Sequence, residues 1–173
     1  MKFTKLLSDL VEQNKGMVER AIDGLGDDEL NRRPDDQSNS IAWLMWHTAR
    51  VADGITSRVQ GSDQLWVTDG WHEKFGMEPD PTINGVGHTG EQVAAFKASA
   101  ADVRGYWTAA LTLCKEYIDS IESEEQLDKE YARPSGDSMT AGAWLRLMTH
   151  EILVHGGQVA YLRGMYTGMG WFP

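Results

Sequence analysis

The sequence predicts an all-α protein: a four-helix bundle with a long aromatic crossover loop between helices two and three. Four stretches have apolar residues that recur every three or four positions, and no segment shows convincing strand-like alternation. An irregular, Trp-rich segment separates the second stretch from the third. With 173 residues, 41% of them hydrophobic, the chain has enough apolar material for one core, so we expect a single domain over residues 1–173.

The first two helices are defined by their apolar spacing and by their end signals. The first is expected over about residues 2–24, where the pattern stops at a Gly-Leu-Gly sequence. Residues 27–39 are charged and turn-rich, which predicts a connection. Ser40 can cap the second helix, which carries an apolar stripe and should end near Gly61.

The remaining elements follow the irregular segment at residues 64–90. It is too irregular for a helix and too aromatic to be only a solvated linker, so we expect an ordered loop. A heptad-like seam from Val93 to Ile121 then predicts one long third helix. An acidic connection over residues 122–137 leads to a fourth helix over about residues 139–166.

Charge and cysteine content restrict the function classes. The formal net charge of −10 argues against a nucleic-acid partner. We also expect no membrane segment and no signal peptide, since the chain has no long apolar run. The single cysteine, Cys114, suits a cytoplasmic protein, and its seam position favours a small buried hydrophobe over a nucleophile. Any metal must therefore bind to nitrogen and oxygen ligands.

Two polar residues interrupt the apolar face of the fourth helix. At 100° per residue from Trp144, Glu151 and His155 fall in the middle of the stripe. A carboxylate buried there costs several kcal/mol unless it is paired, protonated or bound to a cation. The two side chains lie one turn apart on one face, close enough to share a metal ion. A Glu–His hydrogen bond that fixes the packing explains the pattern equally well.

The other histidines differ in how well their positions suit a metal ligand. His150 is five residues from His155, so the pair does not fit the H-E-x-x-H zinc-protease motif, and we expect a solvated His150. His47 lies at the edge of the stripe on the second helix, where it either packs or reaches Glu151 and His155. The roles of three further residues stay open: His72, His88 and Arg163.

Two segments resemble the DinB superfamily of four-helix-bundle metalloproteins. They are SIAWLMWH at residues 40–47 and EILVHGGQVAYLR at residues 151–163. Many members carry a histidine on the second helix and an H-x-x-x-H pair on the last, and here Glu151 takes the first position of that pair. This departure resembles the branch that contains mycothiol-dependent maleylpyruvate isomerase, as does the sequence GWHEKFG at residues 70–76.

The resemblance implies that His47, Glu151 and His155 ligate one divalent metal ion and leave positions open for water or substrate. These ligand types suit Zn²⁺, Ni²⁺, Fe²⁺ or Mn²⁺. The resemblance also implies a low-molecular-weight thiol, such as mycothiol or bacillithiol, as a second cofactor. We expect an apolar pocket near the metal, with walls formed by three aromatic residues of the crossover loop: Trp66, Trp71 and Phe75.

Two function classes follow from this resemblance. The first is a metal-dependent thiol S-transferase or thiol-dependent isomerase-like enzyme that acts on a small electrophile, with its catalytic residues unassigned. The second is a non-catalytic metal-binding protein of stress response or regulation. An open coordination position favours the first, and a fourth protein ligand favours the second. The expected partners are a small-molecule thiol and an electrophile, and the sequence is compatible with a homodimer.

Overall fold

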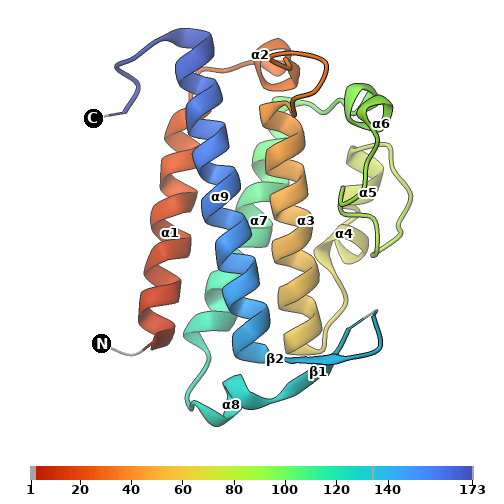
Figure 1. Ribbon diagram of the computed structural model, residues 1–173, viewed down its shortest axis with the longest axis vertical. Helices are drawn as coiled ribbons and strands as arrows, with labels where there is room; N and C mark the ends of the chain where they lie inside the picture. The colour runs from red at the N-terminus through yellow and green to blue at the C-terminus, as the bar shows by residue number, and fades with distance from the viewer. Residues whose placement is uncertain (1–2, 134, 173) are drawn as a thin grey trace.

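Four long helices form the bundle (Figure 1). The computed structural model describes residues 3–133 and 135–172. The long helices are α1 (Phe3–Ala21), α3 (Ile41–Gln60), α7 (Ala100–Asp119) and α9 (Ala141–Thr167). Their apolar faces meet in one hydrophobic core. The predicted fold class, an all-α four-helix bundle, is therefore confirmed.

The helices do not alternate in direction along the chain. Helix α1 runs up in the view of Figure 1, α3 and α7 both run down, and α9 runs up again. Helix α3 packs against α7 and α9, and α1 packs against the same two helices. The long segment between α3 and α7 returns the chain to the upper end of the bundle. That return is what allows α7 to run parallel to α3.

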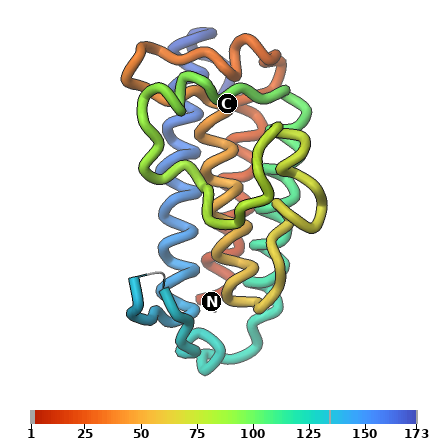
Figure 2. Tube along the Cα trace, turned by 90° about the vertical axis from the view of Figure 1, so that its right-hand side faces the viewer, coloured from red at the N-terminus to blue at the C-terminus, as the bar shows by residue number. Residues whose placement is uncertain are grey.

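Helix α3 begins and ends where its sequence predicts. The Ser40 hydroxyl oxygen accepts a hydrogen bond from the Trp43 amide, 3.1 Å away, which caps the first turn. Gly61 closes the helix in the left-handed conformation, with a φ of 79°. The helix is buried on most sides, because the crossover segment covers the face that the other long helices leave open (Figure 2).

The crossover segment is ordered, and it contains three short helices. They are α4 (Leu65–Thr68), α5 (Trp71–Lys74) and α6 (Gly90–Ala95). The Trp66 side chain is fully buried, and its ring lies 5.7 Å from that of Phe75 and 5.5 Å from that of Tyr106. The aromatic side chains thus extend the bundle core outward and hold the segment in place.

The expectation of one long helix from Val93 to Ile121 is wrong. Helix α6 ends at Ala95, and α7 begins only at Ala100. The Ser99 hydroxyl caps α7, and the Asn31 side chain binds both the amide and the carbonyl of Ala98 in the break. These contacts replace the helical hydrogen bonds that the break removes.

Smaller elements lie at the two ends of the bundle. The turn-rich connection at residues 27–39 contains the short helix α2 (Asp27–Asn31). The acidic connection contains α8 (Glu125–Asp128) and an antiparallel hairpin of β1 (Glu130–Ala132) and β2 (Ser138–Thr140), so the expectation of no strands is wrong here. The Tyr131 hydroxyl donates to the Val59 carbonyl and fixes the hairpin to the end of α3. Strands of three residues are too short to show alternation in the sequence.

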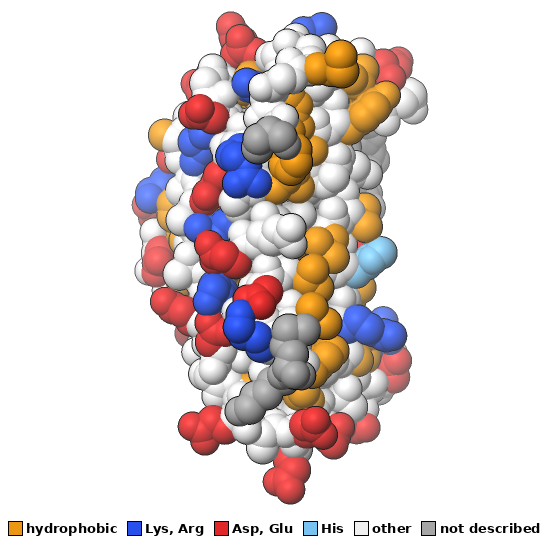
Figure 3. Space-filling model, turned by 90° about the vertical axis from the view of Figure 1, so that its left-hand side faces the viewer, with side chains coloured by type: hydrophobic (Ala, Val, Ile, Leu, Met, Phe, Trp, Pro, Cys, Tyr) orange, Lys and Arg blue, Asp and Glu red, His pale blue; other side chains and the backbone are white. Residues whose placement is uncertain are grey.

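The surface of α9 carries several exposed apolar side chains. They are Leu147, Leu153, Val154, Tyr161 and Met165. Figure 3 shows hydrophobic side chains gathered in a band along the face that it presents, beside a region of mixed charge. Surfaces of this kind often make protein–protein contacts. None of the helices in residues 3–133 and 135–172 has the length and apolarity needed to cross a membrane.

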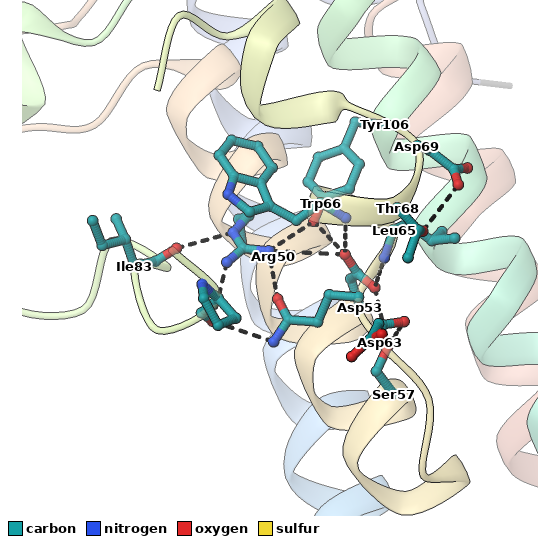
Figure 4. A network of polar contacts seen from close by, with 12 residues as sticks. Arg50, Asp53, Ser57, Asp63, Leu65, Trp66, Thr68, Asp69, Ile83 and Tyr106 are labelled. Carbon is teal, nitrogen blue, oxygen red and sulfur yellow. Dashed lines mark hydrogen bonds and ion pairs between the residues drawn. The ribbon is translucent and has the colours of Figure 1, made fainter. Parts of the chain in front are cut away.

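A buried polar network ties the crossover segment to α3 (Figure 4). The Arg50 guanidinium donates to the carbonyls of Asp80, Pro81 and Ile83 and lies 4.4 Å from the centre of the Trp66 ring.

Asp53 accepts hydrogen bonds from the Leu65 and Trp66 amides and from the Tyr106 hydroxyl, at 2.9, 2.9 and 2.8 Å. Arg50 and Asp53 also form a buried ion pair at 3.8 Å.

Replacing Asp53 with Ala should lower the free energy of unfolding by about 3 kcal/mol or more, because the change leaves the buried Arg50 charge without its carboxylate. The matched control is Asp69→Ala, since Asp69 is exposed and its carboxylate accepts a hydrogen bond from the neighbouring Thr68 hydroxyl. The control should change stability by about 0.5 kcal/mol or less. Urea denaturation followed by circular dichroism measures both, and equal losses would contradict the role given to Asp53.

Candidate metal centre

His47, Glu151 and His155 come together between α3 and α9. One ligand atom from each residue lies within 4.8 Å of the other two. Glu151 Oε2 is 3.6 Å from His47 Nε2 and 3.1 Å from His155 Nε2. The imidazole rings meet edge to face, with their centres 5.0 Å apart. The structure thus brings together the three residues that the sequence singled out, and their role as metal ligands stays a prediction.

The expectation that Glu151 and His155 lie in the middle of a buried stripe is wrong. The core face of α9 runs through Met148, Ile152 and Val159, and Glu151 and His155 lie at its edge. Their side chains are 28% and 16% exposed. The sequence analysis measured angles around the helix from Trp144. Because Trp144 itself lies at the edge of the core face, the predicted middle of the buried stripe was shifted toward solvent. As a result, solvent can reach the centre from one side.

A close helix contact sets the rotation of α9. Gly156 faces Asn14 of α1, and a Cβ atom at Gly156 would approach the Asn14 side-chain oxygen to 2.4 Å. Asn14 is buried, so it has little room to move away. The contact therefore requires a glycine on the side of α9 that faces α1. It leaves His155, the preceding residue, on the side that faces α3.

The His47 ring is held by the crossover segment. Its Nδ1 lies within hydrogen-bonding distance of the Asn84 carbonyl oxygen, and Trp43 stacks on the ring with centres 5.0 Å apart. Gly85 has a φ of 95°, and a Cβ there would come within 2.8 Å of Trp43 and 3.2 Å of His47 Nδ1. The sequence analysis missed Asn84 and Gly85. The Asn-Gly pair signals a tight turn, but it does not show where the carbonyl points.

The hydrogen bond of the His47 ring defines its tautomer. A carbonyl oxygen accepts and cannot donate, so neutral His47 carries its proton on Nδ1 and a lone pair on Nε2. His155 Nδ1 lies 2.7 Å from the side-chain oxygen of Gln158 and its Nε2 lies 3.1 Å from Glu151 Oε2, so a proton on either nitrogen has an acceptor. Burial lowers the pKa of His47, although the Asn84 carbonyl, among other groups, opposes this shift. The neutral, ligand-competent form of His47 is therefore favoured.

The lone pair of His47 Nε2 consequently faces the Glu151 carboxylate, with His155 Nε2 beside them. A cation between these atoms, or a proton on His155 Nε2 that hydrogen-bonds to Glu151, offsets the repulsion. Ligand bonds of about 2 Å in tetrahedral geometry place ligand atoms about 3.3 Å apart. The two distances to Glu151 Oε2, 3.1 and 3.6 Å, bracket that value. The residues therefore fit a divalent cation such as Zn²⁺, Ni²⁺, Fe²⁺ or Mn²⁺.

The other candidate residues lie outside this group. His150 is exposed, as expected. His88 stacks on Trp46 with ring centres 5.7 Å apart and accepts a hydrogen bond from the Trp43 indole. Arg163 donates to the Asp23 carbonyl at 2.9 Å. None of these three side chains therefore joins the group of three ligand candidates, although His88 contacts Trp43, which stacks on His47.

Cys114 is a buried core residue, as its position predicted. It is fully buried, and its sulfur lies 3.5 Å from the Met148 sulfur. Burial raises the pKa of the Cys114 thiol to about 12. The reactive thiolate form is therefore scarce at neutral pH, so Cys114 is not a nucleophile in the folded protein.

The expectation that Trp66, Trp71 and Phe75 line a pocket near the metal centre is wrong. A cavity of about 480 Å³ does reach Glu151, but it lies between α3, α9 and residues 81–86. Trp66, Trp71 and Phe75 do not line it. Their rings pack around Tyr106, with centres 5.5, 5.4 and 6.0 Å from its ring. Packing against α7 buries these aromatic side chains more completely than a solvent-accessible site would.

The chain belongs to the DinB superfamily, since the model of that family matches residues 10–159. The structure is similar to the crystal structure of a conserved protein from Enterococcus faecalis, with a TM-score of 0.85 and 31% sequence identity. That similarity covers 98% of this chain and 99% of the other. No curated protein matches the sequence. The predicted superfamily is therefore confirmed, and the isomerase branch within it stays a prediction.

Replacing Glu151 with Gln should weaken Zn²⁺ binding by about 10-fold or more, because the neutral amide removes the negative ligand. Isothermal titration with Zn²⁺ measures the change. His150→Ala is the matched control on the adjacent residue and should leave the affinity unchanged. Equal losses in the two variants would place the metal on another face of α9. Both variants should keep their helical circular dichroism without metal, since the bundle has its own core.

Proposed function

We propose that the protein is a metal-dependent enzyme that joins a small-molecule thiol to a small electrophile, or uses the thiol to isomerise one. His47, Glu151 and His155 hold one divalent cation in this proposal. The observation that carries it is the convergence of two imidazole nitrogens and one carboxylate oxygen, with the outer nitrogen of each ring within hydrogen-bonding distance of an oxygen. Such outer hydrogen bonds are typical of histidines that ligate metals.

The number of ligands supports catalysis over a purely structural role. Within the described residues, the group of metal-competent side chains has three members. Structural zinc sites in proteins have four protein ligands, whereas catalytic sites keep a position open. The partial exposure of Glu151 and the adjoining cavity provide room for a ligand at that open position.

The proposed chemistry assigns distinct tasks to the chain's residues. A divalent cation lowers the pKa of a thiol from its usual value of about 8.5 and polarises an electrophile. Asn84 keeps the lone pair of His47 directed at the centre, and Glu151 supplies the negative charge there. In transfer, the sulfur forms a bond to the electrophilic carbon, the leaving group departs with its electron pair, and water takes the thiol proton. The choice of a thiol rests on the resemblance to the isomerase branch.

Other features of the proposal concern location and assembly. A single buried cysteine is consistent with a cytoplasmic protein. The exposed apolar side chains of α9 support a homodimer. The net charge of −10 supports small-molecule partners over nucleic acid.

Metal-loaded protein should accelerate the reaction of a thiol with a generic electrophile such as 1-chloro-2,4-dinitrobenzene, and metal-free protein should not. The thiols to be tested are mycothiol, bacillithiol and glutathione, and the absorbance of the conjugate measures the rate. His47→Ala should lose the activity and keep its helical circular dichroism, and His150→Ala should keep both. Metal-loaded protein that binds no thiol and consumes no electrophile would instead support a non-catalytic role in stress response or regulation.

A further inference from the structure

The cavity beside the metal centre is an elongated groove with chemically different ends. It follows α3 and α9, with Glu151 at one end and Arg58 at the other. Since α3 rises 1.5 Å per residue, about 16 Å of helix separates His47 from Arg58. Its apolar lining side chains are Val51, Ile55, Val86, Trp144 and Leu147. The buried Arg50 and the half-buried Gln64 line it as well.

Arg58 provides a positive charge at the far end of the groove. Its guanidinium lies over the Trp144 ring, 5.1 Å from the ring centre, and one nitrogen donates to the Ala132 carbonyl at 2.9 Å. These contacts position the guanidinium without neutralising it. Arg58 is exposed and takes part in none of the ion pairs formed within residues 3–133 and 135–172, although acidic residues outnumber basic ones in this chain. The charge is therefore available to an anionic ligand.

Gly54 keeps the floor of the groove open. It lies in the interior of α3, where glycine costs about 1 kcal/mol relative to alanine. Packing does not require glycine here, because an added Cβ would make only an ordinary contact, 3.5 Å from the Gln64 side chain. Gly54 lines the cavity, so a larger side chain would occupy the space between Glu151 and Arg58.

We propose that the groove selects a thiol substrate that carries a carboxylate at the end of an apolar chain. This inference rests on the proposed function, because the thiol end would lie at the metal centre. The chain would lie along the apolar walls, and the carboxylate would pair with Arg58. A thiol with a metal-binding end alone would leave the apolar walls uncovered and the Arg58 guanidinium without an anionic partner.

Three thiols test the groove with the Zn²⁺-loaded full-length protein. They are 8-mercaptooctanoate, the neutral 8-mercapto-1-octanol of matched length, and the short 3-mercaptopropionate. The octanoate should bind about two- to fivefold more tightly than the octanol, the effect of one exposed ion pair. It should also bind more tightly than the propionate, which is too short to reach Arg58. Isothermal titration gives each affinity.

Variants assign the effect to the groove. Arg58→Gln should bring the octanoate and the octanol to equal affinity, whereas Arg146→Gln, at an exposed position of α9 outside the groove, should preserve the difference. Gly54→Leu should weaken both long thiols about fivefold or more and leave Zn²⁺ and 3-mercaptopropionate binding unchanged. Circular dichroism checks that each variant is folded.

The outcomes separate this inference from the proposed function. If Zn²⁺ and 3-mercaptopropionate bind but the wild-type protein treats the octanoate and the octanol alike, the groove inference is overturned and the metal centre stands. A difference that survives in Arg58→Gln also overturns it. If neither Zn²⁺ nor any thiol binds, the proposed function fails and this inference fails with it.

Discussion

The contact between the Arg50 guanidinium and the backbone of the crossover segment determines the geometry of the candidate centre. Arg50 is buried on α3, three residues after His47, and donates to three carbonyls between Asp80 and Ile83. The next residue, Asn84, presents its carbonyl to His47 Nδ1. One side chain therefore fixes both the path of the segment and the acceptor that orients the imidazole. Asp53 balances the buried charge that this arrangement requires.

The centre combines a rigid part with an accessible part. His47 is rigid, because Trp43, Gly85 and Asn84 surround its ring. Glu151 and His155 lie on the edge of α9, where solvent and the groove can reach them. A divalent cation bound between these side chains would balance the negative charge of Glu151 beside the His47 lone pair.

Periodicity and capping residues predicted most of the fold. Ser40 and Gly61 mark the ends of α3, and the apolar spacing located all four long helices. The break before α7 had one local sign, the N-cap residue Ser99, whereas the Asn31 side chain that stabilises it is distant in sequence. The seam continued through the break, since Phe96 still packs against Trp46. Tertiary contacts of this kind leave no local pattern.

The candidate site was predictable in its side chains and not in its surroundings. Polar residues near an apolar face identified Glu151 and His155, and the rotation of α9 that moves them to the edge depends on the contact between Gly156 and Asn14. The residue that orients His47 uses a backbone carbonyl, which every amino acid has, so no side-chain type at position 84 could reveal it. The pocket was misplaced because Trp66, Trp71 and Phe75 pack against Tyr106.

The histidine tautomers provide the most direct test of the candidate centre. Long-range proton–nitrogen correlation spectra of ¹⁵N-histidine-labelled protein, recorded with and without Zn²⁺, report the protonation of each ring nitrogen. We expect His47 to be neutral with its proton on Nδ1 in the metal-free protein at pH 7.5. Zn²⁺ should shift the Nε2 signals of His47 and His155 and leave those of His150 unchanged. A proton on His47 Nε2 in the neutral ring, or ring signals that do not respond to Zn²⁺, would contradict the account.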